Sequence, residues 1–481
     1  MYYIGIDLGT SSVKLLLLNE EGICNIISRE YDVSYPHHGW SEQNPEDWWN
    51  ETVKGIKELT YDIDKSQVKG ISFGGQMHGL VILDDNDNVI RPAILWNDTR
   101  TQKETDYLNN VIGKEKLVDL TGNIAFAGFT APKIMWVKNN EPDNFNKICK
   151  IMLPKDYLAY KFTGVHSTDV SDASGMLLLD VKNRCWSKEM LEITDINECQ
   201  LPKLFESYEI TGKLKPEIAY ELGFDDVNVI AGAGDNAAAS IGTSTINNGD
   251  CNISLGTSGT VFVSSDKFVP DYKNAIHNFC HANGKYHYMA CILSAASCNK
   301  WWLEGILNTK DYVTEYENYA SLGDNEVVFL PYIMGERSPL NDSNIRGMFY
   351  GISMSTTRHD MSIAILEGVA FALKQNIEII KSMGIDITKS KVCGGGTNNE
   401  LWLRILANVL NIELQIPDNQ EGASYGGALL AARGCNESDY NRLISNDKIR
   451  ETIIPDAELV EKYKNKYKHF LSFYPAIKAV L

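Results

Sequence analysis

One turn in this sequence places an acidic side chain where a substrate could meet it. Residues 227–231 form an apolar, β-branched run typical of a buried strand, and Gly232-Ala233-Gly234-Asp235 follows them. Small helix formers come next at 237–242, so Asp235 is expected at or near a helix start, where backbone N–H groups favour negative charge. A carboxylate there could be held ionised and aimed at a substrate. The alternative is that Asp235 only caps the helix, a common role of Asp.

A second motif is suited to holding an anion. Residues 4–8 are strand-like and enter the turn Gly9-Thr10-Ser11-Ser12, and residues 13–18 leave it as a second strand. Glycine and small hydroxyl residues let backbone N–H groups point at an anion, and Asp7 at the strand's end could hold Mg²⁺ through water. Taken alone this signal is weak, because many hairpins carry the same residues.

The same motif occurs again about half a chain later. Residues 253–261, Ile-Ser-Leu-Gly-Thr-Ser-Gly-Thr-Val, repeat the pattern of residues 6–13, with Ser254 in the place of Asp7. A repeat at half-length predicts two similar domains that face each other. One half then keeps a carboxylate for a metal ion, and the other only binds phosphate.

Other pairs of segments indicate how these motifs are positioned. Strand-like residues 68–73 and 391–393 both open into glycines, and the small-residue segment after Asp235 has a counterpart at 422–432. Helices so free of bulk can cross closely, as a hinge between domains requires, although plain helix packing is compatible with the same pattern.

The alternation of strand-like and helix-like segments predicts an α/β fold. Helices are expected at 48–59 and 360–382, and the domain boundary is expected within 243–250, where Ser, Thr, Asn and Gly cluster. The tail from residue 451 is charged and helical in pattern. The spacing of His277 and His281 could bind a metal ion, but a core or loop role is favoured because no further ligand accompanies the pair.

Composition excludes several classes of function. The chain of 481 residues has 63 acidic and 45 basic side chains and a formal net charge of −18. It has no basic stripe, which argues against nucleic acid and anionic membranes as partners. The ten cysteines include no Cys-x-x-Cys pair, so reduced thiols in a cytoplasmic protein are expected. The N-terminus lacks a signal-peptide pattern, and the leucine run at 15–18 is too short to span a bilayer.

Two longer motifs resemble the signatures of a known family. Residues 128–140, Gly-Phe-Thr-Ala-Pro-Lys-Ile-Met-Trp-Val-Lys-Asn-Asn, fit the first, and residues 347–352, followed by Asp360-Met361 and 364–367, fit the second. With the turns described above, nearly the whole chain resembles the FGGY family of carbohydrate kinases.

The resemblance implies two actin-like, ribonuclease-H-like α/β domains with a central ATP cleft. Residues 1–246 would form the N-terminal domain with the sugar site and the base, and residues 247–481 the C-terminal domain with the ATP site. The implied cofactors are ATP and Mg²⁺, and the implied partners are a small-molecule sugar and ATP, without nucleic acid or membrane. A homodimer is compatible with the resemblance.

Within the family, Gln76-Met77-His78 indicates the substrate. Glycerol kinases carry an Arg-Glu pair where Met77-His78 stands here, so the resemblance points towards members that phosphorylate D-xylulose to D-xylulose 5-phosphate. Two alternatives remain. One is a family member that acts on ribulose, gluconate or a polyol such as glycerol. The other is an actin-like ATPase that is not a kinase, which would carry a peptide-binding domain or filament-forming insertions, and neither is apparent.

The resemblance also implies roles for the residues at matching positions. Asp235 would accept the proton of the attacking hydroxyl, and Asp7 would orient hydrated Mg²⁺. The sugar would contact Met77, His78, Asn236, Arg100, Asp98 and Gln76. The phosphates of ATP would contact Thr10, Ser11, Gly256, Thr257 and Ser258, and its adenosine would lie along Gly394, Gly395, Gly396 and Asn399.

Overall fold

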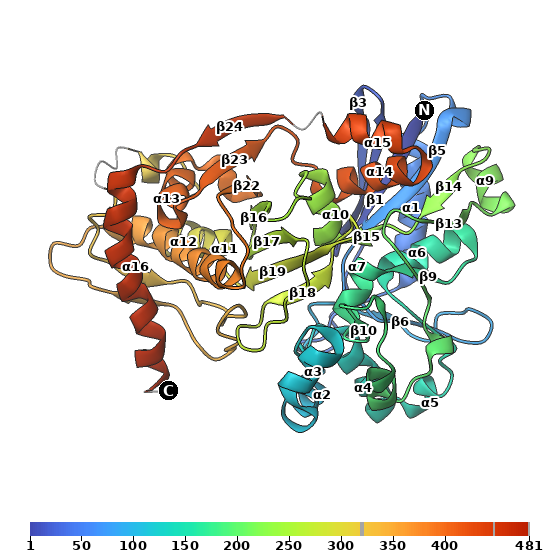
Figure 1. The fold of residues 1–481 in the computed structure, drawn as a ribbon, viewed down its shortest axis with the longest axis horizontal. Helices are drawn as coiled ribbons and strands as arrows, with labels where there is room; N and C mark the ends of the chain where they lie inside the picture. Colours follow the sequence, from blue (N-terminus) through green and yellow to red (C-terminus); the bar gives the residue numbers. More distant parts are fainter. Residues whose placement is uncertain (318–321, 446–447, 480–481) are drawn as a thin grey trace.

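Each half of the computed structural model, which describes residues 1–317, 322–445 and 448–479, is built on a seven-stranded sheet (Figure 1). In the first sheet, β1 (Tyr2–Leu8) pairs antiparallel with β2 (Ser12–Asn19) and parallel with β5 (Val68–Gly75). The other strands are β3 (Gly22–Glu30) beside β2, β14 (Asn228–Ile230) and β15 (Ala233–Gly234) beside β5, and β13 (Ile210–Lys213) at the edge.

The second sheet repeats this arrangement. β16 (Cys251–Leu255) pairs antiparallel with β17 (Gly259–Ser265) and parallel with β22 (Lys389–Cys393), as β1 does with β2 and β5. The sheet continues through β19 (Tyr286–Ile292) and β18 (His277–Cys280) on one side and β23 (Glu413–Pro417) and β24 (Ile449–Ile453) on the other. Asp7 and Ser254 therefore occupy equivalent positions in the two sheets. The predicted repeat and the α/β fold are confirmed.

Helices cover the sheets, and both predicted long helices are present. Asn44 caps α1, which starts at Pro45, and Thr357 and Asp360 form a capping box at the start of α12. The helices are α1 (Pro45–Leu59), α2 (Gln102–Tyr107), α3 (Lys114–Thr121), α4 (Thr130–Asn140), α5 (Pro142–Phe145), α6 (Pro154–Thr163), α7 (Val170–Ala173), α8 (Lys188–Thr194), α9 (Pro216–Leu222), α10 (Asp235–Gly242), α11 (Ala296–Lys300), α12 (Arg358–Ser382), α13 (Glu400–Leu410), α14 (Gly422–Cys435), α15 (Glu437–Ile444) and α16 (Ala457–Lys478).

Short strand pairs complete the fold outside the two sheets. They are β4 (Glu42–Gln43) with β7 (Ala93–Ile94), β6 (Val81–Leu83) with β8 (Lys150–Met152), β9 (Ser167–Asp169) with β12 (Lys203–Phe205), β10 (Leu179–Asp180) with β11 (Cys185–Trp186), and β20 (Val328–Leu330) with β21 (Met348–Tyr350). No helix among the described residues is long and apolar enough to cross a membrane.

The two halves meet at helices made of small residues. α10 and α14 cross so closely that a Cβ on Gly426 would lie 1.8 Å from the carbonyl oxygen of Ala238. α14 also crosses β1, because a Cβ on Gly5 would lie 1.9 Å from the carbonyl oxygen of Ser424. Figure 1 shows α14 and α15 against the first sheet, although they come late in the chain. The predicted close crossing is confirmed, and its use as a hinge stays a prediction.

Gly426→Ala is expected to lower the free energy of unfolding by about 1–3 kcal/mol, because the added methyl group meets backbone that cannot give way. Gly427→Ala in the same helix is the matched control, since its Cβ would find its nearest neighbour at 3.4 Å. That control is expected to be neutral or stabilising, because alanine favours the helix. Urea denaturation of both variants checks the prediction, and equal effects would contradict the close crossing.

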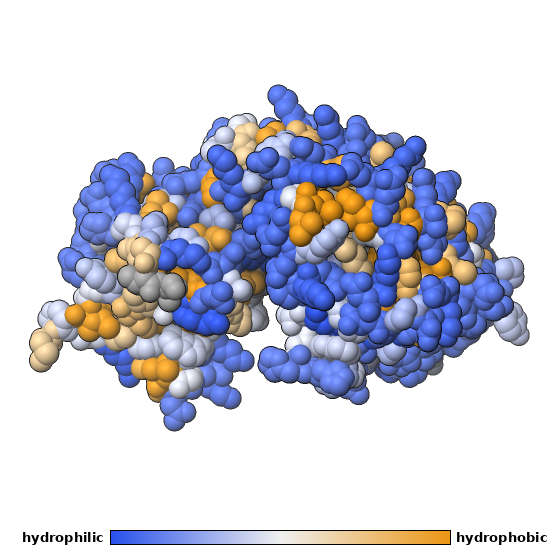
Figure 2. Space-filling model, turned by 90° about the horizontal axis from the view of Figure 1, so that it is seen from below, coloured by the Kyte–Doolittle hydropathy of each residue, from blue (hydrophilic) through white to orange (hydrophobic). Residues whose placement is uncertain are grey.

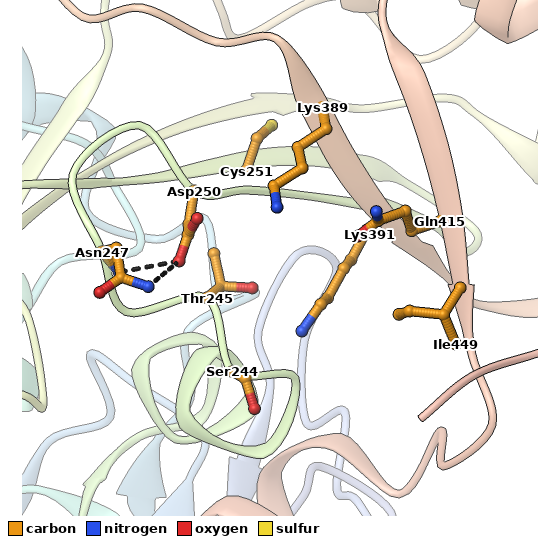
Figure 3. A pocket seen from close by; sticks show the side chains of 9 residues that line it. All are labelled: Ser244, Thr245, Asn247, Asp250, Cys251, Lys389, Lys391, Gln415 and Ile449. Carbon is orange, nitrogen blue, oxygen red and sulfur yellow. Dashed lines mark hydrogen bonds between the residues drawn. The ribbon is translucent and has the colours of Figure 1, made fainter. Parts of the chain in front are cut away.

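The segment between the halves, residues 243–250, is held against the second sheet. Lys391 Nζ donates to the carbonyl oxygen of Thr243, and Asp250 Oδ2 accepts from the backbone N–H of Asn247 at 2.8 Å. Figure 3 shows Lys389 and Lys391 reaching from β22 into a pocket of about 230 Å³ beside this segment. The connection between the halves is thus tied to β22, the strand that precedes Gly394.

The two histidines with metal-like spacing are both buried. His281 is buried, and its Nε2 lies 3.0 Å from the carbonyl oxygen of Thr245. His277 is buried against Phe279, with ring centroids 5.3 Å apart. Both side chains therefore lie in the core, one of the two placements expected for this pair, and their role stays a prediction.

Candidate active site

A cavity of about 300 Å³ is lined by side chains from both halves of the chain. Viewed from below, the molecular surface is notched between the two halves (Figure 2). From the predicted site the cavity brings together Met77, His78, Asp235, Asn236, Gly256 and Ser258. Residues far apart in sequence, from the end of β5 to the β16–β17 turn, therefore meet at one place.

Asp235 is the first residue of α10, and Gly234 rather than Asp235 is the N-cap. Its Oδ1 accepts from the backbone N–H of Asn236 at 2.6 Å and from Asn236 Nδ2 at 2.7 Å. Both hydrogen bonds that the described residues give this carboxylate fall on Oδ1, so Oδ2 is available to a hydroxyl in the cavity. Burial raises the pKa of Asp235 to about 6. The group is therefore ionised at neutral pH, and it is a stronger base than an exposed Asp.

Asp7 lies at the end of β1, close enough to Asp235 for their charges to interact. Burial first, and then the charge of Asp235, raises the pKa of Asp7 to about 7, although Lys14 opposes the shift. Lys14 is itself paired with Glu421 at 3.0 Å. This corner has more negative than positive charge, so a divalent cation fits it.

The ligand set at this corner is small. Among the described residues no group of three His, Cys, Asp or Glu side chains could hold a metal ion. A cation at Asp7 would therefore keep several waters or share ligands with phosphates, as Mg²⁺ does.

His78 is fixed as a neutral hydrogen-bond acceptor. Its Nδ1 lies 2.8 Å from the carbonyl oxygen of Gly175, which can only accept, so Nδ1 carries the proton and Nε2 does not. Burial lowers the pKa of His78 to about 3, and the ring stacks on Phe129 with centroids 4.6 Å apart. Nε2 is thus suited to accept a hydrogen bond from a hydroxyl.

The two hairpin turns are held through their carbonyl groups and hydroxyls. Gln43 Nε2 donates to the carbonyl oxygen of Thr10 at 2.7 Å, and Trp96 Nε1 donates to Thr10 Oγ1 at 3.0 Å. The carbonyl oxygen of Thr257 accepts from the N–H of Ala295 at 3.0 Å. Ser11 lies in the first turn and Ser258 in the second, so both predicted phosphate turns are firmly positioned.

Of the three glycines after β22, Gly395 borders open space, while Gly394 and Gly396 lie against Leu255. Gly394 has a φ of +92°, and a Cβ on Gly395 would meet no atom within 4 Å. Asn399 caps α13 by accepting from the N–H of Trp402 at 3.0 Å, while its buried Nδ2 lacks a partner among the described residues. Asn399 also lines a pocket of about 520 Å³ with Tyr312 and other residues. The unpaired amide of Asn399 in this pocket and the open backbone at Gly395, four residues earlier, are compatible with an adenosine group.

Three predicted sugar contacts do not line the cavity. Arg100 pairs with Asp98 through two hydrogen bonds of 2.9 and 2.7 Å and with Glu42 at 2.7 Å, and its side chain is 1% exposed. Gln76 Nε2 donates to Gln43 Oε1 at 3.3 Å. Asp98 and Arg100 are paired with each other, while Gln76 Oε1 is buried without a partner among the described residues. Direct contact of these three residues with sugar stays a prediction.

Sequence reasoning missed several residues that line the cavity. Arg337 contributes a positive charge, with its guanidinium carbon 5.6 Å from the ring centroid of Phe126, and Phe129 supports His78. Phe129 lies within a motif that was recognised, but the pattern does not say that its ring faces the site. Arg337 belongs to no repeat or motif used above, so no signal pointed to it.

Comparisons with known proteins agree with this architecture. The model of the FGGY family of carbohydrate kinases, N-terminal domain, matches residues 2–242, and that of its C-terminal domain matches residues 251–435. The chain is 39% identical to a xylulose kinase of Escherichia coli, with 98% of each chain covered, and 37% identical to one of Klebsiella pneumoniae, with 100% of each covered.

A solved structure gives the same result. The crystal structure of a "xyloylose kinase" from Brucella ovis superposes with a TM-score of 0.96 at 40% identity and covers 100% of both chains. The two-domain sugar-kinase architecture expected from the resemblance is confirmed. With two matching domain models and full-length relatives, this chain belongs to the FGGY family of carbohydrate kinases.

Proposed function

We propose that this protein is an ATP-dependent xylulose kinase, which transfers the γ-phosphoryl group of ATP to D-xylulose and forms D-xylulose 5-phosphate and ADP. The observation that carries the proposal is the cavity in which Asp235 and His78 face a phosphate-type turn of the other half. Full-length relatives named xylulose kinase support the choice of sugar.

Asp235 is the general base in this proposal. Its free Oδ2 accepts the proton of the attacking primary hydroxyl, while Asn236 holds Oδ1 in place. In phosphoryl transfer the proton leaves late, so a carboxylate contributes mainly by orienting the hydroxyl. Met77 packs on the carbon skeleton of the sugar, and His78 Nε2 accepts from a sugar hydroxyl.

ATP lies between the two halves in this proposal. Thr10 and Ser11 from one turn and Gly256, Thr257 and Ser258 from the other bind its phosphates. Gly394, Gly395, Gly396 and Asn399 bind its adenosine. Mg²⁺ near Asp7 would neutralise charge on the phosphates. Arg337 adds a fixed positive charge on the cavity wall.

In this proposal residues 1–246 form the domain that binds the sugar and carries the base, and residues 247–481 form the domain that binds ATP. The match to the first domain model ends at residue 242 and the match to the second begins at residue 251, which supports this boundary.

We further propose that the protein is cytoplasmic, because all ten cysteines are free. A homodimer stays a prediction, which light scattering of the purified protein can check.

The substrate is tested by kcat/KM for D-xylulose, D-ribulose and glycerol. D-xylulose is expected to be the best substrate, D-ribulose a weaker one because one hydroxyl points the other way, and glycerol the poorest because it lacks most contacts.

His78→Ala is expected to lower kcat/KM for D-xylulose by an amount that corresponds to about 1–3 kcal/mol of transition-state stabilisation, the range for an unpaired buried polar group. The same variant should narrow the preference over D-ribulose and leave the low activity with glycerol nearly unchanged. A wild-type preference for ribulose or glycerol would overturn the proposed substrate but not the kinase activity.

A further inference from the structure

A buried cluster of charges lies behind the proposed base. Lys155 Nζ is 2.7 Å from Asp156 Oδ1, 2.9 Å from Asp169 Oδ1 and 3.7 Å from Asp172 Oδ2. All four side chains are at most 1% exposed, and the charge of Asp235 still acts on Asp172. The cluster is therefore inaccessible to substrate but close to the active site.

The segment that follows Asp169 reaches the active site at two points. Ser171 Oγ accepts from the backbone N–H of Gly234 at 3.2 Å, and Gly234 is the N-cap that precedes Asp235. Four residues after Ser171, the carbonyl oxygen of Gly175 accepts from His78 Nδ1 at 2.8 Å. One short buried segment thus contacts both the base turn and the proposed sugar-binding histidine.

The hydroxyl of Ser171 has a fixed direction. It donates to Asp169 Oδ2 at 2.5 Å, so its lone pairs are turned towards Gly234. Asp169 is in turn held by Lys155 through its other oxygen and by Ser207 Oγ at 2.7 Å. The chain Lys155–Asp169–Ser171 therefore fixes where the acceptor for the Gly234 N–H lies.

We propose that Ser171, oriented by Asp169 and Lys155, is a positioning residue that sets the location of the base Asp235. This inference rests on the proposed function, because it assigns Ser171 an effect on a proton-accepting carboxylate. A shift of about 1 Å in a reacting group can change a rate by about 10²-fold, so a hydrogen bond at the preceding residue can control turnover.

The chain offers a matched control for this proposal. Ser171 and Ser207 are both fully buried, and both donate to Asp169 Oδ2, but only the Ser171 side chain contacts Gly234. Ser171→Ala is expected to lower kcat about 10-fold or more, with KM for ATP and sugar within twofold of wild type. Ser207→Ala removes the same kind of bond from Asp169 but leaves the contact of Ser171 with Gly234, so it is expected to lower kcat much less than Ser171→Ala does.

A double-mutant cycle separates positioning of the base from general damage. In an Asp235→Asn background, Ser171→Ala is expected to change the residual rate by less than twofold, because the group that it positions is already disabled. Equal kcat losses in Ser171→Ala and Ser207→Ala, or an undiminished loss in the Asp235→Asn background, would overturn the proposal.

Two further measurements keep the test decisive. If Ser171→Ala does not fold, Ser171→Cys keeps a hydrogen-bonding group at the same position, although the thiol is larger and bonds more weakly, and an intermediate loss of kcat is expected. Unchanged kcat in that variant would also overturn the proposal. All rates are taken with the best sugar found for the wild-type protein, so failure with D-xylulose counts against the proposed substrate and leaves the positioning test intact.

Discussion

Asp235→Asn is expected to lower kcat by about 10²-fold or more while the fold and ATP binding are retained. The amide keeps the shape of the side chain and can still accept from Asn236, but it cannot take up the proton of the attacking hydroxyl. The measurement is steady-state ADP release with D-xylulose, together with thermal unfolding and ATP titration of both proteins. A variant with near-wild-type kcat would remove Asp235 from the mechanism.

The pH dependence of kcat provides an independent check on Asp235. The base must be ionised, so activity is present above its pKa and is lost as pH falls through it. The pKa of about 6 places this acid limb at pH 6, or lower once a cation near Asp7 favours the ionised form. The limb should be absent from the residual activity of Asp235→Asn, and an identical limb in both proteins would assign it to another group.

Much of the fold could be predicted because its signals are local. The runs around Asp7 and Ser254 are apolar strands that end in small turn residues, and both formed the expected hairpins in equivalent places. The close crossing of α10 and α14 was predictable from small residues, since bulk is absent where backbones touch. The prediction of a helical tail from residue 451 was only partly right, because β24 extends to Ile453 before α16 begins at Ala457. That strand forms by pairing with β23, which local pattern cannot show.

The candidate site, like the fold, could be predicted only where its signals are local. Asp235 and His78 lie in motifs whose turns fix their positions, and both reached the cavity. Asp98 and Arg100 are two residues apart and satisfy one another, and Glu42 completes the pair from a distant strand. No local pattern in the sequence predicts that Glu42 pairs with Arg100. The role proposed for Ser171 is equally invisible, since it depends on contacts with Asp169 and a distant backbone N–H.

Lys155→Met is expected to lower the free energy of unfolding by about 3–5 kcal/mol, the cost of removing one partner from a buried charge network. Three carboxylates, those of Asp156, Asp169 and Asp172, are within 3.7 Å of this ammonium and have no access to water. Burial already raises the pKa values of Asp156 and Asp172, and the loss of Lys155 would raise them further. Urea denaturation of both proteins at pH 8 measures the effect.

The sign of the pH dependence distinguishes lost charge pairing from lost packing. Carboxyls with raised pKa values in the folded state are tolerated when protonated, so the penalty of Lys155→Met should shrink from pH 8 to pH 5. Asp172→Asn is the matched control, because it removes one of the three carboxylates that share one ammonium. This variant should lower the free energy of unfolding by less than about 1 kcal/mol. The double variant Lys155→Met/Asp172→Asn should recover part of the loss. A pH-independent penalty without such recovery would mean that Lys155 acts through the packing of its aliphatic chain and not through its charge.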